Sequence, residues 1–304
     1  MIDGVLLLWF FLTAGSVFFV VYDSVTNTRT SWVQKLAWIL VTIYTGPIGL
    51  FVYFLTCRSP GPGMHEAFTS ATWKQSVNSE IHCLAGDATG IVIAAAIVPA
   101  FGLPNGWDLV LEYTSAFLVG LFVFQALMMI SMFDGNYFLA VRKTFFAETV
   151  SMNAVMVGMI PTMMLLMRYV PHAREPWFPE FWFVMGMAAI VGGLTAYPMN
   201  WWLVTNHLKH GCMTLPEGDL PAPKMGHGSA ETPAPMNMHG GHGSHDTDDD
   251  AMRGGDESHG GDHDHSMMMR ELPMGQTIAW MAGTFALMLL AAWITSQFAP
   301  ISFS

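Results

Sequence analysis

The stretch Ser79-Glu80-Ile81-His82-Cys83-Leu84-Ala85-Gly86-Asp87 opens an apolar segment that continues to about Phe101. Within it, Glu80, Cys83 and Asp87 are spaced by three and four residues, so on a helix they share one side. The stretch lies at the mouth of a predicted membrane helix, where an ionised Asp87 is costly unless it faces a partner, an ion or water. We therefore predict a metal-ion site built from Glu80, His82, Cys83 and Asp87.

Two alternatives stay open for this stretch. His82 points about 100° away from Cys83 on a regular helix, so it joins the site only if the helix unwinds or a neighbouring helix closes the gap. A purely structural role also fits, because carboxylates near a helix N-terminus interact favourably with the helix dipole and a buried Cys83 can simply pack.

The composition is that of a polytopic membrane protein. Hydrophobic residues make up 52% of the chain and charged residues 12%, and the mean hydropathy is +0.40, which excludes an ordinary soluble domain. The chain has only 12 Lys and Arg residues, and much of its formal charge of −11 comes from one acidic loop, so we expect the lipid bilayer and no nucleic acid as a partner. Three cysteines cannot form a disulfide framework.

Seven apolar runs have the length of membrane helices, which predicts an all-α polytopic bundle. They cover residues 5–21, 33–55, 81–101, 109–132, 149–167, 181–204 and 276–298. The second run contains Gly46-Pro47, which predicts a kink. These runs divide the chain into two N-terminal helices with a polar loop (1–78), a four-helix membrane core (79–212), a disordered metal-binding loop (213–274) and a C-terminal membrane helix (275–304).

The segment between the sixth and seventh runs has a different composition. It is rich in Gly, Pro, His, Met and Asp and nearly free of branched or aromatic apolar residues, so we predict disorder. Imidazoles suit Cu(II), Zn and Ni, whereas thioethers select Cu(I), so copper suits both best and zinc or nickel is the alternative. A solubilising insert that happens to be His-rich also fits. The candidate ligands are His227, His239, His242, His245, His259, His263 and His265.

A ladder of methionines lies along the predicted fifth helix. Methionine accounts for 25 of the 304 residues, and part of this excess falls at helical spacing below a carboxylate. A carboxylate above successive thioethers fits a path for Cu(I). Ordinary packing is the competing explanation, because Met is an adaptable apolar filler. The residues concerned are Glu148, Met152, Met156, Met159 and Met163.

With seven spans, the N-terminus would share one side of the membrane with the loops after the second, fourth and sixth helices. That side would hold every cysteine and every histidine except His172. Asp3 before the first helix, with Arg29 and Lys35 after it, places the N-terminus outside. We therefore expect a multi-pass protein of the plasma (inner) membrane with an extracytoplasmic ligand side and His/Met loop. A count of all flanking cations instead favours a cytoplasmic ligand side.

Several short motifs resemble the bacterial membrane family catalogued as domain of unknown function 4396. They are His82-Cys83 with Gly86, Glu148-Thr149-Val150-Ser151, Phe181-Trp182-Phe183 and Tyr197-Pro198-Met199-Asn200-Trp201-Trp202. The resemblance covers roughly residues 79–212. In that family a second Cys often follows the Gly and an Asp takes the place of Glu148, whereas this chain has Asp87 and Glu148. The family's association with multicopper oxidases implies a copper setting and a multicopper oxidase or other cuproenzyme as partner, without an assigned mechanism.

Together these patterns predict a membrane protein that handles a soft transition metal, with copper as the favoured ion. The loop would capture the ion and pass it to the helix-three site with Glu148, for transport or for delivery to a cuproenzyme. A structural or assembly subunit of a respiratory complex is the first alternative. A membrane redox enzyme ranks last, because no histidines face each other at mid-membrane depth. We favour a non-enzymatic role, and no nucleotide-binding loop is present.

Overall fold

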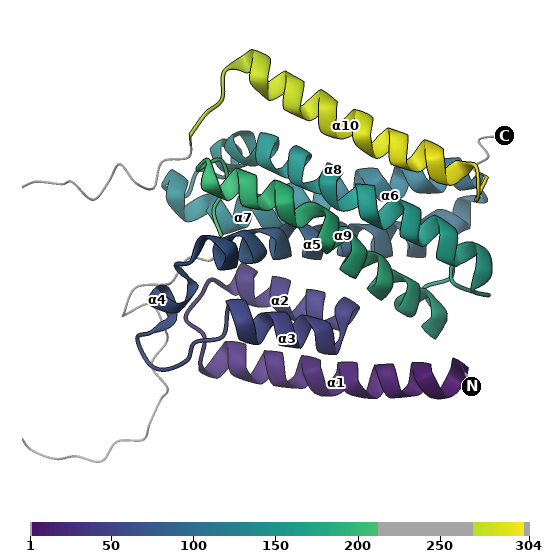
Figure 1. The fold of residues 1–304 in the computed structure, drawn as a ribbon, viewed down its shortest axis with the longest axis horizontal. Coiled ribbons are helices and arrows are strands. Elements are labelled where there is room, and N and C mark those ends of the chain that lie inside the picture. Colours follow the sequence, from purple (N-terminus) through teal and green to yellow (C-terminus); the bar gives the residue numbers. More distant parts are fainter. Residues whose placement is uncertain (1, 212–269, 301–304) are drawn as a thin grey trace, which may run out of the picture. The chain divides into compact units, whose positions relative to one another are not determined.

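The computed structural model describes residues 2–211 and 270–300 and is entirely helical there, apart from turns and loops. Six segments in these residues are long and apolar enough to cross a membrane, so the chain is an all-α, multi-pass membrane protein (Figure 1). The predicted metal-binding loop lies outside the described residues. The six segments are α1 (Ile2–Thr26), α5 (Thr72–Ile97), residues Gly106–Phe133, α8 (Tyr137–Tyr169), α9 (Pro179–Thr205) and α10 (Met274–Ser296).

Six of the seven predicted spans coincide with these segments, but two helices begin earlier than predicted. Helix α5 starts at Thr72 instead of residue 81, and α8 starts at Tyr137 instead of residue 149. Polar side chains near the start of each helix, Lys74 and Gln75 in α5 and Arg142 and Lys143 in α8, end an apolar run without ending a helix. The predicted division between residues 78 and 79 falls inside α5. It also follows that Cys83 lies about three turns inside α5 and not at its mouth.

The segment predicted as the second span is a helical hairpin. It consists of α2 (Trp32–Thr45) and α3 (Pro47–Thr56), which lie side by side in Figure 1. The ring centroids of Trp38 and Tyr53 are 5.4 Å apart, whereas 15 residues of straight helix would separate them by about 22 Å. The prediction of a continuous second span is therefore wrong: the chain enters the bundle and turns back.

The reversal occurs at Gly46-Pro47, where the sequence predicts only a kink. Gly46 has a φ of 59°, in the left-handed region that favours glycine, and Pro47 has no N–H with which to continue α2. A Cβ at Gly46 would lie 2.5 Å from Thr13 Oγ1 of α1, so only glycine fits. Since Thr13 lies in the N-terminal half of α1, the tip of the hairpin reaches past the middle of that helix.

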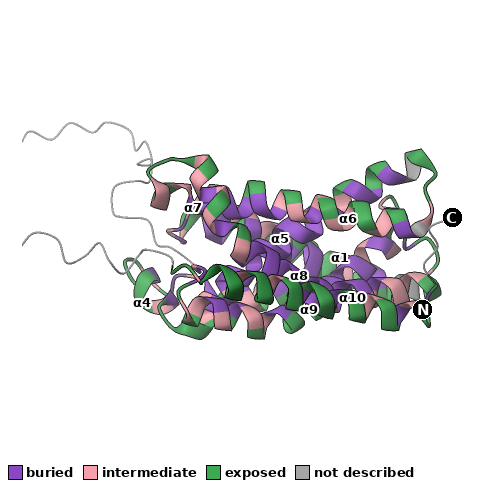
Figure 2. Ribbon diagram, turned by 90° about the horizontal axis from the view of Figure 1, so that it is seen from above, coloured by how far each residue is buried: buried purple, intermediate pink, exposed green. Residues whose placement is uncertain are grey.

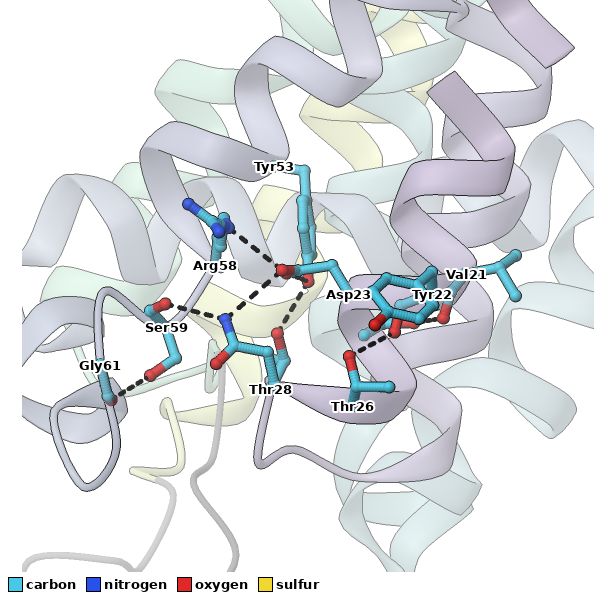
Figure 3. A network of polar contacts seen from close by, with 11 residues as sticks. Val21, Tyr22, Asp23, Thr26, Thr28, Tyr53, Arg58, Ser59 and Gly61 are labelled. Atoms are coloured by element: carbon cyan, nitrogen blue, oxygen red, sulfur yellow. Dashed lines mark hydrogen bonds and ion pairs between the residues drawn. The ribbon is translucent and has the colours of Figure 1, made fainter. Parts of the chain in front are cut away.

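The base of the hairpin is tied to the end of α1 by a polar network (Figure 3). The Tyr53 hydroxyl donates to Asp23 Oδ2 at 2.8 Å, and Arg58 Nε donates to Asp23 Oδ1 at 3.1 Å. The hydroxyls of Thr28 and Tyr53 are 2.7 Å apart. Helix α5 joins through Asn78, whose Nδ2 donates to the Thr56 carbonyl at 2.9 Å. These contacts fix where α3 returns.

The hairpin changes the topology that the sequence predicts. Helices α1, α3 and α9 end, and α5, α8 and α10 begin, at one end of the bundle, which we call the loop end; α1 starts and α10 ends at the opposite, far end (Figure 1). Cys57, His65, His207 and His210 lie at the loop end, as predicted. The N-terminal start of α1 does not, so the prediction that it shares the ligand side is wrong.

Helices α5 and α8 form the interior, and α1 and α10 form much of the outside. In Figure 2 buried residues concentrate on α5 and α8, whereas α10 is largely exposed. Helix α5 meets the Gly106–Phe133 segment at small residues: a Cβ at Gly86 would lie 2.5 Å from the Gly120 Cα. Such small residues let membrane helices approach closely. The contact brings Gly120 next to the polar side of α5.

The hairpin predicts which loops face the same side of the membrane. We expect a membrane-impermeant maleimide to label Thr26→Cys and Pro62→Cys from one side and Leu103→Cys from the other. All three residues are exposed, and the tests use a Cys212→Ser background because Cys57 and Cys83 are buried. The measurement is labelling of intact cells against everted vesicles. A second span in place of the hairpin would instead pair Thr26→Cys with Leu103→Cys.

Candidate functional site

A buried polar cluster lies between α5, α8, α9 and the segment that follows α9. We call it the Cys83 cluster; it consists of Cys83, Glu148, Ser151, Asn200 and Lys209. Cys83 Sγ donates to Glu148 Oε2 at 2.9 Å, and Lys209 Nζ donates to Cys83 Sγ at 2.8 Å. Cys83 and Glu148 have no exposed surface, and Lys209 is 4% exposed. A thiol, a carboxylate and an ammonium group therefore meet away from solvent.

Two neutral side chains complete the cluster on the side of α9. Lys209 Nζ also donates to Asn200 Oδ1 at 2.9 Å and to Ser151 Oγ at 3.1 Å. The Ser151 hydroxyl in turn donates to Asn200 Oδ1 at 2.9 Å. Asn200 of α9 thus accepts a hydrogen bond from Ser151 of α8, as polar side chains between membrane helices commonly do.

A pair of carboxylates occupies the other side of Cys83. A Cβ at Gly120 would lie 2.2 Å from Glu148 Oε1 and 3.5 Å from Asp87 Oδ1, so both acids border this glycine. Three of the four oxygens of Asp87 and Glu148 are buried without a hydrogen-bond partner in the described residues. Buried polar atoms in proteins are nearly always paired, so these three call for a ligand or water.

A wider helical turn supports the carboxylate side. Residues Gly120–Gln125 form the π-helix η2, which separates α6 (Asn105–Val119) from α7 (Ala126–Met129). Gln125 Nε2 lies 3.7 Å from Cys83 Sγ. Short π-helical turns occur frequently at functional sites, because the extra residue redirects side chains.

The other two predicted ligands on α5 do not join the cluster. Helix α5 is regular throughout, so it does not unwind to bring His82 beside Cys83. Both ring nitrogens of His82 are buried and without a hydrogen-bond partner among the described residues. Glu80 faces α9 instead, where a Cβ at Gly193 would lie 3.0 Å from Glu80 Oε1. The structure thus brings together only part of the predicted set.

The described residues contain no ready-made multidentate metal site. No three His, Cys, Asp or Glu side chains among them lie close enough together to hold a metal ion. Structural zinc sites use four such ligands and catalytic zinc sites three. The donors that do meet at Cys83 are one sulfur and a few oxygens, which is a poor fit to zinc. The predicted histidine ligands of the loop, residues 227–265, lie outside the described residues.

The methionine ladder is buried along α8. Met152, Met156, Met159 and Met163 are each at most 6% exposed. Met159 packs against α9, where a Cβ at Gly192 would lie 2.5 Å from its Cγ. Met163 borders a cavity of about 330 Å³ at the far end, which is also lined by Met164, Met167, Asp108, Glu112 and Glu175. Burial is compatible with packing as well as with a path, but the ladder does reach a second acidic surface.

Sequence reasoning missed Lys209 as a member of the site. It treats Lys209 only as a flanking charge, because the residue follows α9 and precedes a polar segment. The chain turns back after α9: His207 has a φ of 57°, and Leu208 N donates to the Leu203 carbonyl at 2.9 Å. This turn directs Lys209 into the bundle, and no periodic pattern in the sequence reveals it.

Comparison with known proteins identifies the domain without assigning an activity. Residues 72–209 match the family model described as Domain of unknown function (DUF4396), which confirms the resemblance that the sequence motifs indicate. The matched segment runs from the first residue of α5 to Lys209, so it contains every member of the Cys83 cluster. No curated protein and no solved structure matches the chain.

The contact between Gly120 and Glu148 predicts an energetic coupling. We expect Gly120→Ala to lower the free energy of unfolding by about 1–3 kcal/mol, because its methyl group overlaps the Glu148 carboxylate. In the Glu148→Ala background the same substitution should cost at least about 1 kcal/mol less. Thermal and denaturant unfolding in mild detergent measure both effects. Gly283→Ala is the control, because nothing lies within 4 Å of its added Cβ; strictly additive effects would contradict the geometry.

Proposed function

We propose that this membrane protein, which carries a DUF4396 domain, binds a soft transition-metal cation, Cu(I), at Cys83 and passes it between the two ends of the bundle. The observation that carries the proposal is the buried Cys83 thiol beside Glu148 and Asp87, three of whose oxygens have no partner in the described residues. Carboxylates inside a membrane bundle are costly unless they face a cation, a proton or water, and such residues commonly mark ion paths.

The chemistry of the donors favours a soft monovalent ion. Thiols and thioethers select Cu(I), whereas zinc and nickel sites use several nitrogen, sulfur and oxygen ligands together. The Cys83 cluster offers one sulfur, and the ladder that starts one turn after Glu148 offers four more. The zinc and nickel alternatives therefore have less support in the described residues than copper has.

Passage across the bilayer needs a route and two openings. Met152, Met156, Met159 and Met163 follow one side of α8 from the cluster toward the far end. The last of them borders the far-end cavity, whose lining holds three carboxylates against one cation, Arg174, and so keeps a net negative charge that would attract a cation. The thioethers can relay Cu(I) because each binds it weakly enough to release it to the next.

The revised topology changes the orientation that we propose. With the hairpin, the charges on either side of α1, Asp3 before it and Arg29 and Lys35 after it, favour a cytoplasmic loop end. The count of all described cations favours the same side. Arg168 and Arg174 lie at the far end. The described cations at the loop end are Arg29, Lys35, Arg58, Lys74, Arg142, Lys143, Lys209 and Arg270. We therefore propose that the ion enters from the cytoplasm, in place of the extracytoplasmic entry that the sequence favours.

The His/Met loop and a receiving protein belong to the same proposal. The loop continues from the loop end, and its imidazoles and thioethers are suited to collect copper there. The association of the family with multicopper oxidases makes such an enzyme the favoured recipient at the far end.

Binding at Cys83 is tested by comparing serine substitutions at two buried cysteines. We expect Cys83→Ser to weaken Ag(I) binding, a stable substitute for Cu(I), by about 100-fold or more, because it removes the soft ligand. Cys57→Ser is the matched control, since Cys57 is equally buried but lies at the end of α3. Equilibrium dialysis against a soft chelator measures both, in the full chain and in a chain without residues 216–268. Equal binding by the two variants would favour the assembly-subunit alternative.

Passage of the ion is tested by substituting two methionines of the ladder. We expect Met156→Leu combined with Met159→Leu to leave Ag(I) binding intact and to slow Ag(I) uptake into everted vesicles about tenfold or more, because leucine keeps the volume but removes the sulfur. The control is Met185→Leu, a buried methionine on α9 outside the ladder. Uptake at the parental rate would return the ladder to a packing role.

A further inference from the structure

Lys209 occupies a site whose three acceptors match its ammonium group. An ammonium has three N–H donors and no acceptor. In the described residues Lys209 Nζ has three partners, at 2.8 Å on Cys83, 2.9 Å on Asn200 and 3.1 Å on Ser151. All three partner residues are fully buried. A soft sulfur and two oxygens thus converge on one positive charge.

The lysine is held there by the backbone that carries it. Residues 206–211 form a short non-helical return, which we call the return segment. The Arg270 N–H donates to the His207 carbonyl at 2.9 Å, and Leu208 is 4% exposed. A Cβ at Gly211 would lie 2.3 Å from the Gln75 carbonyl oxygen, so this glycine packs directly on α5. The return segment follows the end of α9 and therefore lies at the loop end.

No carboxylate oxygen of the described residues lies within ion-pair distance of Lys209. Instead, Lys209 donates to the sulfur of Cys83, and Cys83 donates in turn to the Glu148 carboxylate. Burying an ammonium without a direct counter-ion is costly, so this arrangement needs a reason beyond packing. The acceptors would serve any small cation at the same point.

We propose that Cys83 Sγ, Ser151 Oγ and Asn200 Oδ1 form a cation site that the Lys209 ammonium fills at rest, and that a soft monovalent cation replaces this ammonium one for one. The inference rests on the proposed function for the role of Cys83, and it adds Ser151 and Asn200 as ligands and Lys209 as an internal competitor. Two cations cannot share the sulfur, because like charges at this separation repel strongly in a buried site.

The exchange preserves both charge and hydrogen bonds. The soft cation binds the thiolate, so the Cys83 thiol proton moves to Glu148, its hydrogen-bond partner. One positive charge then leaves as one enters, whereas a divalent ion would leave an extra buried charge. Ser151 and Asn200 keep their mutual hydrogen bond when the lysine withdraws, and Asn200 Nδ2 keeps the Ala196 carbonyl at 3.3 Å. The emptied site therefore has few unsatisfied groups other than those that the cation binds.

The first test removes the competitor. We expect Lys209→Leu to tighten Cys83-dependent Ag(I) binding at least tenfold, because leucine removes the competing charge and adds no metal ligand. Lys209→Arg, which keeps the charge, should bind no more tightly than the parent. Each variant is measured in the full chain against its own Cys83→Ser counterpart, which subtracts ions held by the loop. Parental or weaker binding by Lys209→Leu would overturn the exchange while leaving the role of Cys83 standing.

The second test uses the parental chain and does not depend on the folding of a variant. Lys209 should resist acylation by an amine reagent without Ag(I) and become reactive when Ag(I) is bound, as read by mass spectrometry of the peptide. Lys143, whose side chain is 35% exposed, should react in both states. A Lys209 that stays protected with Ag(I) bound would overturn the proposal. Loss of the proposed function itself would appear separately, as unchanged Ag(I) binding in Cys83→Ser.

Discussion

The cost of burying charge among membrane helices governs the centre of this structure. Cys83, Glu148 and Lys209 are each nearly or fully buried, and hydrogen bonds link Lys209 to Cys83 and Cys83 to Glu148. Burying an isolated ion costs several kcal/mol of folding free energy even after relaxation. Removing one member would leave its charged partner unpaired and so incur this cost. The arrangement explains why the chain turns back after α9: without the return segment, the ammonium would not reach the thiol.

Close helix contact buries that centre. Gly86 and Gly120 allow α5 and the Gly106–Phe133 segment to approach within a distance that no side chain would permit. The same contact lets the Glu148 carboxylate lie against Gly120, where any larger residue would overlap it. Asp87 and Glu148 are thereby buried in the bundle, where electrostatic interactions are stronger than in bulk water. Packing and chemistry thus depend on the same two glycines.

The sequence predicts the fold class, six of the spans and the gathering of polar residues at one end, because these depend on apolar length and helical spacing. It does not predict the hairpin, since an apolar run of residues 33–55 is equally compatible with a kink and with a reversal at Gly46. It places Cys83, Asp87 and Glu148 in the candidate site, but not Lys209. Spacing along one helix identifies residues that share a side, whereas the return of a short loop into the bundle depends on contacts with Gln75 and Arg270.

The hairpin also bears on direction. Because α2 and α3 do not cross the membrane, the cations that follow α1 join those at the loop end. The charges on either side of α1 and the count of all described cations, which share Arg29 and Lys35, then favour the same orientation. A cytoplasmic loop end places Lys209 and Cys83 nearer the reducing compartment, where a free thiol persists and copper is present as Cu(I). The far-end cavity, with its carboxylates and Met163, would then face outward. In the proposed orientation, Cys83 with Glu148, then the thioethers of α8, then the carboxylates of the far-end cavity would form a route out of the cell.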